Sequence, residues 1–486
     1  MCYQHGLTEQ LRKMPIREKM PPLGSALTHQ HESAEDWEIR FHQEGLMIPQ
    51  LQRDTPVSSP EITSQWSLAT RIAFRFGFSY FLLYVYPRSV GSLGAFVKYN
   101  NPLRDMWHAV VPWVGTHVLH LAGDFTEVAN GSGDQLYDYV LLFCIAMTAA
   151  IATIIWSWLD RKRPNYEGLY QWMRFFVRVV VAVAMISYGA DKLFRMQFAA
   201  PALARYVDTF GQTSPMGLLW AFMGMSRGYS FMGGVGEMTG GLLLIIPGLT
   251  TLGTLITLGM MSNVLMLNLF YDVPRKIYSI HLILFCLFLL LPDMRRLVDF
   301  FLLNRRTQLS PSIPAFKDKK VNYGMWALQI GIGVVALIVC CNAGYRDALK
   351  NETYIQPSLR GIWSVKDFAF DASGRPPLLT DTERWQNVIF DAPDILTIQS
   401  MDGTQKRYYL QLDAPDQSFT LWDPPDAHWN ARFTFDTSRP GRLILDGRFG
   451  EHSVNATLTR VDMSDPVKFL LLNRGMHWVN QYPNNR

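Results

Sequence analysis

The chain has 486 residues, too many for one ordinary domain, and a mean hydropathy near zero that averages apolar and polar segments. Its formal net charge is only +4, and its basic residues lie mainly beside apolar runs, which argues against nucleic-acid binding. None of the five cysteines follows residue 341, so the C-terminal part is no disulfide scaffold and must fold on core packing.

Residues 1–62 are predicted to form a cytoplasmic, largely irregular tail. This segment mixes proline, glutamine, histidine and charged residues without a sustained period. It also lacks the apolar stretch of a cleavable signal peptide. The first apolar span is therefore expected to act as the export signal.

Apolar residues crowd into residues 63–345, which are predicted to form a transmembrane helical domain. Several runs approach the roughly 20 residues that a helix needs to cross a bilayer. Seven spans are expected, at residues 66–86, 136–158, 172–193, 231–247, 250–270, 277–291 and 323–342. The apolar segments 107–122 and 217–225 are too short to cross and are expected to be interfacial or re-entrant.

Basic residues indicate the orientation of these spans. Arg161, Lys162 and Arg163 cluster in one loop, and a second basic cluster lies between residues 295 and 320. The positive-inside rule makes both loops cytoplasmic. With seven spans, the N-terminus is then cytoplasmic and the C-terminal domain periplasmic or extracellular, in a bacterial inner membrane.

Residues 352–486 are predicted to form a β-rich extracytoplasmic domain. Eight short alternating stretches, separated by turn residues such as Asp402-Gly403, indicate an antiparallel meander. Closure into a barrel would remove the edge strands, and another barrel or a sandwich stays open as an alternative. Gly361-Ile362-Trp363 with Arg474 near the end resembles the lipocalin-like pattern, in which an arginine packs across the first-strand tryptophan. Trp363 and Arg474 are therefore expected to form a brace.

Residues 170–305 carry three elements in a fixed order. Arg178 lies in the first span of this segment, Gly189-Ala190-Asp191-Lys192 ends that span, and Glu237-Met238-Thr239-Gly240-Gly241 belongs to the next span. This arrangement resembles the DoxX-like membrane protein family, and the likeness extends to a longer bacterial subgroup with an extra C-terminal domain. The resemblance implies the helical fold. Because some DoxX-like proteins are linked to thiosulfate oxidation with quinone as acceptor, it also implies a quinone-linked oxidoreductase subunit as one hypothesis.

Ionisable side chains within spans are costly, so each is a candidate site residue. A ligand-binding cluster is expected near the outer membrane face, formed by Tyr188, Asp191, Lys192, Glu237, Asp272 and His281. Glu237, His281 and Lys192 are the catalytic candidates, because a carboxylate and an imidazole at apolar depth could exchange protons with a quinone. The alternative is a Lys192–Glu237 ion pair that joins two helices without a substrate.

Three arginines fall in the inner halves of their spans: Arg71, Arg75 and Arg178. They could bind an anionic lipid group, or their side chains could reach the lipid phosphates at the interface.

Two further motifs resemble binding sites, and each also has a simpler structural explanation. His117 and His120 could place two imidazoles beside Asp124, but a third ligand at motif spacing is missing, so no metal is expected. Asp134 is expected to cap the span that follows it. No haem, iron–sulfur or nucleotide motif stands out, so a diffusible quinone is the one cofactor considered.

Three functions follow from these patterns. The leading hypothesis is a membrane module whose external β-domain binds a ligand or a protein partner. The alternatives are a quinone-linked oxidoreductase subunit and a transporter of a lipid or small solute.

Overall fold

The structure is a computed structural model that describes residues 65–85, 102–123, 125, 132–307, 318–353, 359–392, 394–423, 426–465, 467–475 and 478. The tail predicted for residues 1–62 and the residue Asp124 lie outside these ranges.

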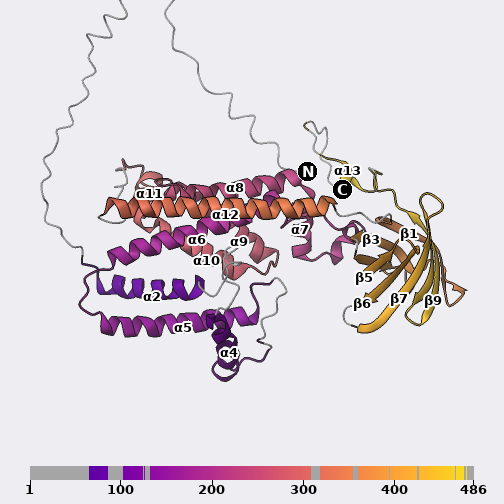
Figure 1. The fold of residues 1–486 in the computed structure, drawn as a ribbon, viewed down its shortest axis with the longest axis horizontal. Coiled ribbons are helices and arrows are strands. Elements are labelled where there is room, and N and C mark those ends of the chain that lie inside the picture. The colour runs from indigo at the N-terminus through magenta and orange to yellow at the C-terminus, as the bar shows by residue number, and fades with distance from the viewer. Residues whose placement is uncertain are drawn as a thin grey trace, which may run out of the picture. The chain divides into compact units, whose positions relative to one another are not determined.

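The first part of the described chain is helical (Figure 1). Its helices are α2 (Leu68–Val85), α4 (Pro102–His117), α5 (Leu136–Leu159), α6 (Glu167–Leu193), α7 (Pro215–Met225), α8 (Arg227–Ile245), α9 (Thr250–Phe270), α10 (Lys276–Leu290), α11 (Met294–Phe301) and α12 (Lys319–Thr353). Short 3-10 turns occur at η2 (Leu203–Tyr206), η3 (Phe210–Gln212) and η4 (Leu291–Asp293).

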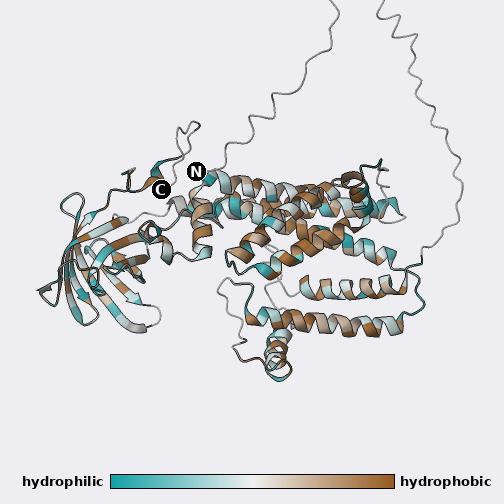
Figure 2. Cartoon of the chain, turned by 180° about the vertical axis from the view of Figure 1, so that it is seen from behind, coloured by the Kyte–Doolittle hydropathy of each residue, from teal (hydrophilic) through white to brown (hydrophobic). Residues whose placement is uncertain are grey.

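Within the described ranges, five helical stretches are long and apolar enough to cross a membrane. They are Leu136–Leu159, Glu167–Leu193, Thr250–Phe270, Lys276–Phe301 and Lys319–Lys350. The predicted spans at α2 and α8 are not among them, because α2 carries two arginines and α8 is rich in glycine. Hydrophobic residues follow the long helices in Figure 2, whereas polar and apolar residues mix along the strands. The expected apolar helical part is confirmed at this level.

Helix α6 lies at the centre of the larger helical core and packs against α8, α10 and α12. Small residues allow the close approach of α6 and α8. A Cβ atom on Gly189 would lie 2.9 Å from the carbonyl oxygen of Gly234, and one on Gly241 would lie 2.8 Å from that of Ala182. These glycines therefore form a packing face, as small-residue motifs often do between membrane helices.

The C-terminal part is an antiparallel sheet closed on itself. Its strands are β1 (Gly361–Phe370), β2 (Ser373–Gly374), β3 (Trp385–Ala392), β4 (Ile395–Ser400), β5 (Gln405–Asp413), β6 (Ser418–Asp423), β7 (Asp426–Asp436), β8 (Arg442–Phe449) and β9 (His452–Arg460). From β3 to β9 each strand pairs with the next, and β1 pairs with β2, β3 and β9. Since β2 is only a two-residue extension of the β1 hairpin, the closed barrel has eight strands, and the barrel prediction is confirmed.

Side chains of alternate strand residues fill the inside of the barrel. Phe390, Phe419 and Phe433 are almost fully buried there, and Trp385 packs against Phe433 and Phe449 at ring-centroid distances of 5.8 and 5.3 Å. An eight-stranded barrel encloses just enough room for such a core. The barrel therefore owes its fold to apolar packing, as expected from its lack of cysteine.

Candidate functional site

Lys192 and Glu237 form a buried ion pair between α6 and α8. The Lys192 Nζ atom donates to both carboxylate oxygens, at 2.9 and 2.7 Å. Lys192 is 7% exposed and Glu237 is 1% exposed, so water screens the pair little. The rings of Tyr188 and Phe198 lie 5.7 and 5.8 Å from the ammonium group, within reach of a cation–π interaction.

His281 belongs to a second group, formed with two tyrosines of α2. Its Nδ1 atom lies 2.7 Å from the Ile277 carbonyl oxygen and must donate there, because a carbonyl only accepts. The Nε2 atom forms a hydrogen bond with the Tyr80 hydroxyl, 2.8 Å away. The Tyr84 ring stacks on the imidazole at a centroid distance of 3.8 Å. These contacts join α2 to α10.

The side chains of the expected outer cluster therefore make their hydrogen bonds in two groups. Tyr188 stays with the ion pair and makes an edge contact with Tyr278, at a centroid distance of 5.9 Å. Asp191 is half-buried beside Lys192, and its carbonyl oxygen accepts from the backbone of Met196. Asp272 is exposed and pairs with Lys276 at 3.1 Å.

Arg75 holds the loop between α5 and α6. Only 1% of this residue is exposed, and its guanidinium donates to the Tyr166 hydroxyl, the Ser157 hydroxyl and the Asp160 carbonyl oxygen at 2.8 to 3.0 Å. The Tyr166 hydroxyl in turn donates to the Asp160 carboxylate at 2.9 Å. Arg75 therefore does not reach lipid phosphate, which corrects its assignment as an anionic-lipid candidate.

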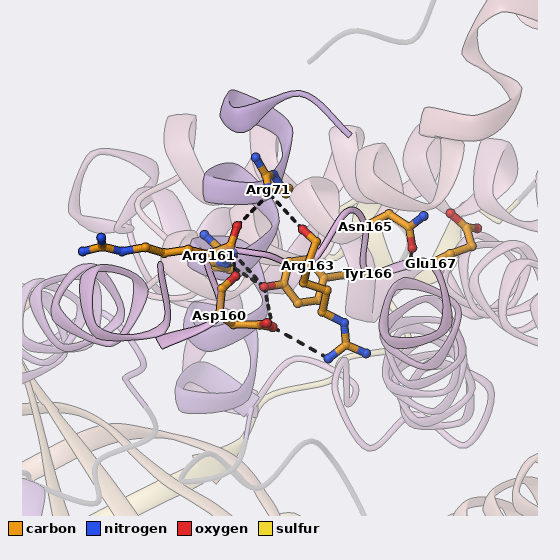
Figure 3. Close-up of polar contacts among 8 residues, drawn as sticks. Arg71, Asp160, Arg161, Arg163, Asn165, Tyr166 and Glu167 are labelled. Carbon is orange, nitrogen blue, oxygen red and sulfur yellow. Dashed lines mark hydrogen bonds and ion pairs between the residues drawn. The ribbon is translucent and has the colours of Figure 1, made fainter. Parts of the chain in front are cut away.

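Arg71, one turn before Arg75, serves the same loop (Figure 3). Its Nη1 atom donates to the carbonyl oxygens of Arg163 and Arg161, at 2.8 and 3.3 Å. The Arg163 side chain forms an ion pair with the Asp160 carboxylate, with Nη1 and Oδ2 3.7 Å apart. Arg71 and Arg75, which were expected to bind lipid, therefore donate hydrogen bonds to the basic loop between α5 and α6.

Arg178 reaches a polar layer at the turn between α8 and α9. Its guanidinium donates to the Thr250 hydroxyl at 3.1 Å and to the side-chain oxygen of Gln329 on α12. The Gln329 amide then donates to the carbonyl oxygens of Leu244 and Ile245, at 3.0 and 2.6 Å. These carbonyls end α8 and lack partners within their own helix.

His117 ends α4, and His120 follows that helix. The His117 ring stacks on Trp113 and lies 2.7 Å from the Thr116 hydroxyl, and His120 is exposed. No group of three histidine, cysteine or acidic side chains that could hold a metal ion occurs among the described residues.

Asp134 caps a helix other than the predicted one. Its carboxylate accepts from the backbone nitrogens of Lys276 and Ile277, at 2.7 and 3.0 Å. The capped helix is therefore α10, which lies 142 residues further along the chain than Asp134, and not the adjacent α5.

The brace of the barrel uses a different arginine from the predicted one. The Arg460 guanidinium lies 5.9 Å from the Trp363 ring centroid and donates to the Arg360 carbonyl oxygen at 2.8 Å. The Trp363 indole donates to the Leu359 carbonyl oxygen at 2.7 Å. Arg460 thus takes the place assigned to Arg474, whose backbone nitrogen closes a turn on Leu470.

The loop between α6 and α7 docks on the outer wall of the barrel. The Leu203 backbone nitrogen donates to the Asp391 carboxylate at 2.8 Å. The side-chain amides of Gln399 and Gln405 donate to the carbonyl oxygens of Val207 and Ala204, each at 3.2 Å. Ala204 also joins a small buried apolar cluster with Ile362 and Ile389 of the barrel. This loop connects the barrel to the helices.

Another part of the outer wall is exposed and carries arginine and aromatic side chains. Tyr409 on β5 and Trp422 on β6 are directly opposite and stack at a centroid distance of 5.9 Å. One row away, Arg432 on β7 and Arg448 on β8 face each other and are both exposed. Like charges in directly opposed positions destabilise a sheet. These four residues are called the Arg-aromatic wall below.

Sequence reasoning missed three kinds of site residue. Tyr80 and Tyr84 share a helix face by their four-residue spacing, which could have marked them as partners for a buried histidine. Gln329, a polar side chain inside an apolar span, could have been singled out in the same way as the charged residues. The docking residues Asp391 and Gln399 carry no local signal.

Comparisons with known proteins add a likeness without a function. No model of a protein family matches the chain, and no solved structure matches it. The chain is similar to Uncharacterized protein YwoB of Bacillus subtilis (strain 168), with 29% identity over 104 residues. This alignment covers 20% of the present chain and 68% of the Bacillus protein. The likeness therefore concerns a limited segment and names no activity.

Proposed function

We propose that the chain is an integral membrane module that holds its barrel outside the cytoplasm and presents the Arg-aromatic wall to a protein partner. In this proposal α2 and α8 join the five long apolar helices as spans, which gives the DoxX-like helical part seven. The basic loop at residues 161–163 then faces the cytoplasm of a bacterium, and the N-terminal tail lies on the same side.

The docking of the barrel on the α6–α7 loop is the observation that carries this proposal. A tethered ligand-binding domain needs only a flexible linker. Here a buried apolar cluster and three side-chain hydrogen bonds hold the wall that contains Ile362 and Ile389. Because one face of the barrel is docked, the Arg-aromatic wall has a defined orientation. A surface that is presented to a partner requires such an orientation.

The composition of the exposed wall favours an acidic protein as the partner. Tyrosine, tryptophan and arginine are the side chains that contribute most at protein interfaces. The opposed Arg432 and Arg448 repel each other, and a partner carboxylate between them would relieve that repulsion. Two exposed acidic residues are neighbours: Asp446 lies one row away, and the Glu451 backbone carbonyl oxygen accepts from Arg448 at 3.3 Å. An internal ligand has less support, since aromatic side chains fill the barrel.

The oxidoreductase alternative draws less support from the geometry. It requires Glu237 and His281 to act on one quinone, yet both carboxylate oxygens of Glu237 accept from Lys192. The two nitrogens of His281 are engaged by Tyr80 and by the Ile277 carbonyl oxygen. A structural ion pair accounts for the first group, and a helix–helix contact accounts for the second. The transporter alternative has no observation in its favour.

The proposal can be tested by cross-linking in the bacterial cell. A photoreactive amino acid at Gln411, an exposed wall position next to the Thr420–Arg432 row, should give one discrete cross-linked protein. Charge reversal by Arg432→Glu together with Arg448→Glu should remove that product, because it would repel an acidic partner. High salt during the experiment should weaken the cross-link for the same reason.

Arg439→Glu is the matched control, because Arg439 is exposed in the same domain but lies in the β7–β8 hairpin. It should leave the cross-linked product unchanged. A product that persists after charge reversal at Arg432 and Arg448, or no product at all, would overturn the partner proposal. A reporter fused after Tyr345 that reports cytoplasm would overturn the topology.

A further inference from the structure

Arg174 and Arg178 form a pair of cations on one face of α6. They are four residues apart, so their side chains are neighbours on the helix and their like charges oppose each other. The Nε atom of each guanidinium is buried and has no hydrogen-bond partner. Such buried donors are costly when they stay unpaired.

The pair has no carboxylate partner within the described part of the chain. Arg178 donates only to the neutral side chains of Thr250 and Gln329. Arg174 instead makes a cation–π contact, with its guanidinium 5.9 Å from the Tyr170 ring centroid. Asp293, which bonds to the adjacent Thr251, is already paired with Arg296 at 2.6 Å. Two positive charges on an apolar helix therefore lack a counter-ion.

The surroundings combine this charge with exposed apolar surface. Leu249 and Leu252 are exposed where α9 begins, and the neighbouring Thr250 accepts from Arg178. A ligand that fits both features carries an anion and an apolar chain.

We propose that Arg174 and Arg178 bind a phosphate group, and that a phospholipid headgroup is its source. Guanidinium groups bind phosphate oxygens through charge-assisted hydrogen bonds, and basic pockets between membrane helices hold anionic headgroups. The phosphate would accept from the terminal guanidinium nitrogens of these two partly exposed arginines. The acyl chains would lie on the exposed apolar residues where α9 begins, Leu249 and Leu252. This site is separate from the Arg-aromatic wall and does not depend on it.

The test is native mass spectrometry of the purified full chain in detergent with equal amounts of phosphatidylglycerol and phosphatidylcholine. The wild type should retain phosphatidylglycerol preferentially. Arg174→Gln should weaken this binding by about tenfold, the loss expected for a charged hydrogen bond. Arg174 is the cleaner position, because none of its hydrogen bonds to protein would be lost and the helices should stay folded.

Arg295→Gln is the matched control, since this arginine is 95% exposed and tests for unspecific attraction to anionic lipid. Arg178→Lys, which keeps the charge, should retain more binding than Arg178→Gln, and thermal unfolding checks that both variants fold. Inorganic phosphate is titrated separately: stabilisation by phosphate that Arg174→Gln abolishes, without lipid preference, would keep the anion site but make free phosphate its source. Equal retention of both lipids with no effect of phosphate, or binding that Arg174→Gln leaves unchanged, would overturn the proposal.

Discussion

The Lys192–Glu237 pair allows a decisive test of whether this polar group is structural. Each side chain alone is a buried charge, and removal of one partner from a buried pair costs about 3–5 kcal/mol. Lys192→Met and Glu237→Leu should each lower the free energy of unfolding by about that amount, since the pair is almost fully buried. The double variant should return to within about 1 kcal/mol of the wild type, because apolar side chains of similar volume replace the pair.

The four proteins can be compared by unfolding in mixed detergent with tryptophan fluorescence as the signal. A second cycle on the exposed pair of Asp272 and Lys276, with Asp272→Asn and Lys276→Met, is the matched control. Its coupling energy should be below about 1 kcal/mol, as for other exposed pairs. The difference between the two cycles isolates the effect of burial.

Additive losses in the Lys192–Glu237 cycle would refute this reasoning, because they would mean that the two charges do not stabilise each other. The cross-link at Gln411 supplies an independent readout. If the stable double variant keeps that cross-link, the pair is structural. If it folds normally but the protein loses its cellular function, the two charges take part in chemistry.

Three further outcomes are expected. Asp391→Ala, which removes the acceptor of a docking hydrogen bond, should make trypsin cleave after Arg205 several-fold faster in limited proteolysis, as the loop detaches from the barrel. Arg75→Met should lower the free energy of unfolding by about 3 kcal/mol or more in the detergent assay, because buried polar groups around it lose their donor. Hydrogen bonds from His452 and the Ser453 backbone lower the pKa of Asp371, so this carboxylate stabilises the barrel above its unfolded pKa of 3.8 and loses that effect as pH falls through the lower folded value. The thermal midpoints of wild type and Asp371→Asn, measured from neutral pH down to about pH 3, should therefore converge at the acidic end; a constant difference would contradict this.

Local patterns in the sequence predicted the elements well. Long apolar runs predicted helices, because a run of that length must be buried in a core or in lipid. Alternation with turn residues predicted the strands, and the need to remove sheet edges favoured the closed barrel that the structure has. The Lys192–Glu237 contact could be anticipated from depth, since each charge lies near the same end of adjacent helices.

Contacts between distant segments could not be read in this way. Asp134 sits beside α5 in the sequence, yet it caps α10, because the packing of the helices brings the start of α10 to it. The sequence suggested that the Arg75 side chain reaches lipid. Only the tertiary structure shows that its guanidinium donates to the Tyr166 hydroxyl. The arginine that packs over Trp363 is Arg460 of β9, because β9 is the strand that pairs with β1 and closes the barrel.

The sequence by itself determined the type of each part: apolar helices followed by a barrel with an apolar interior. Those properties depend on the period and length of hydrophobic runs, which are local. The tertiary structure decided that Glu237 pairs with Lys192, that His281 bonds to Tyr80, and how residues 203–207 dock on the barrel wall. Such contacts depend on helix packing and barrel closure, and a side chain's partner there is set by geometry that no single segment encodes.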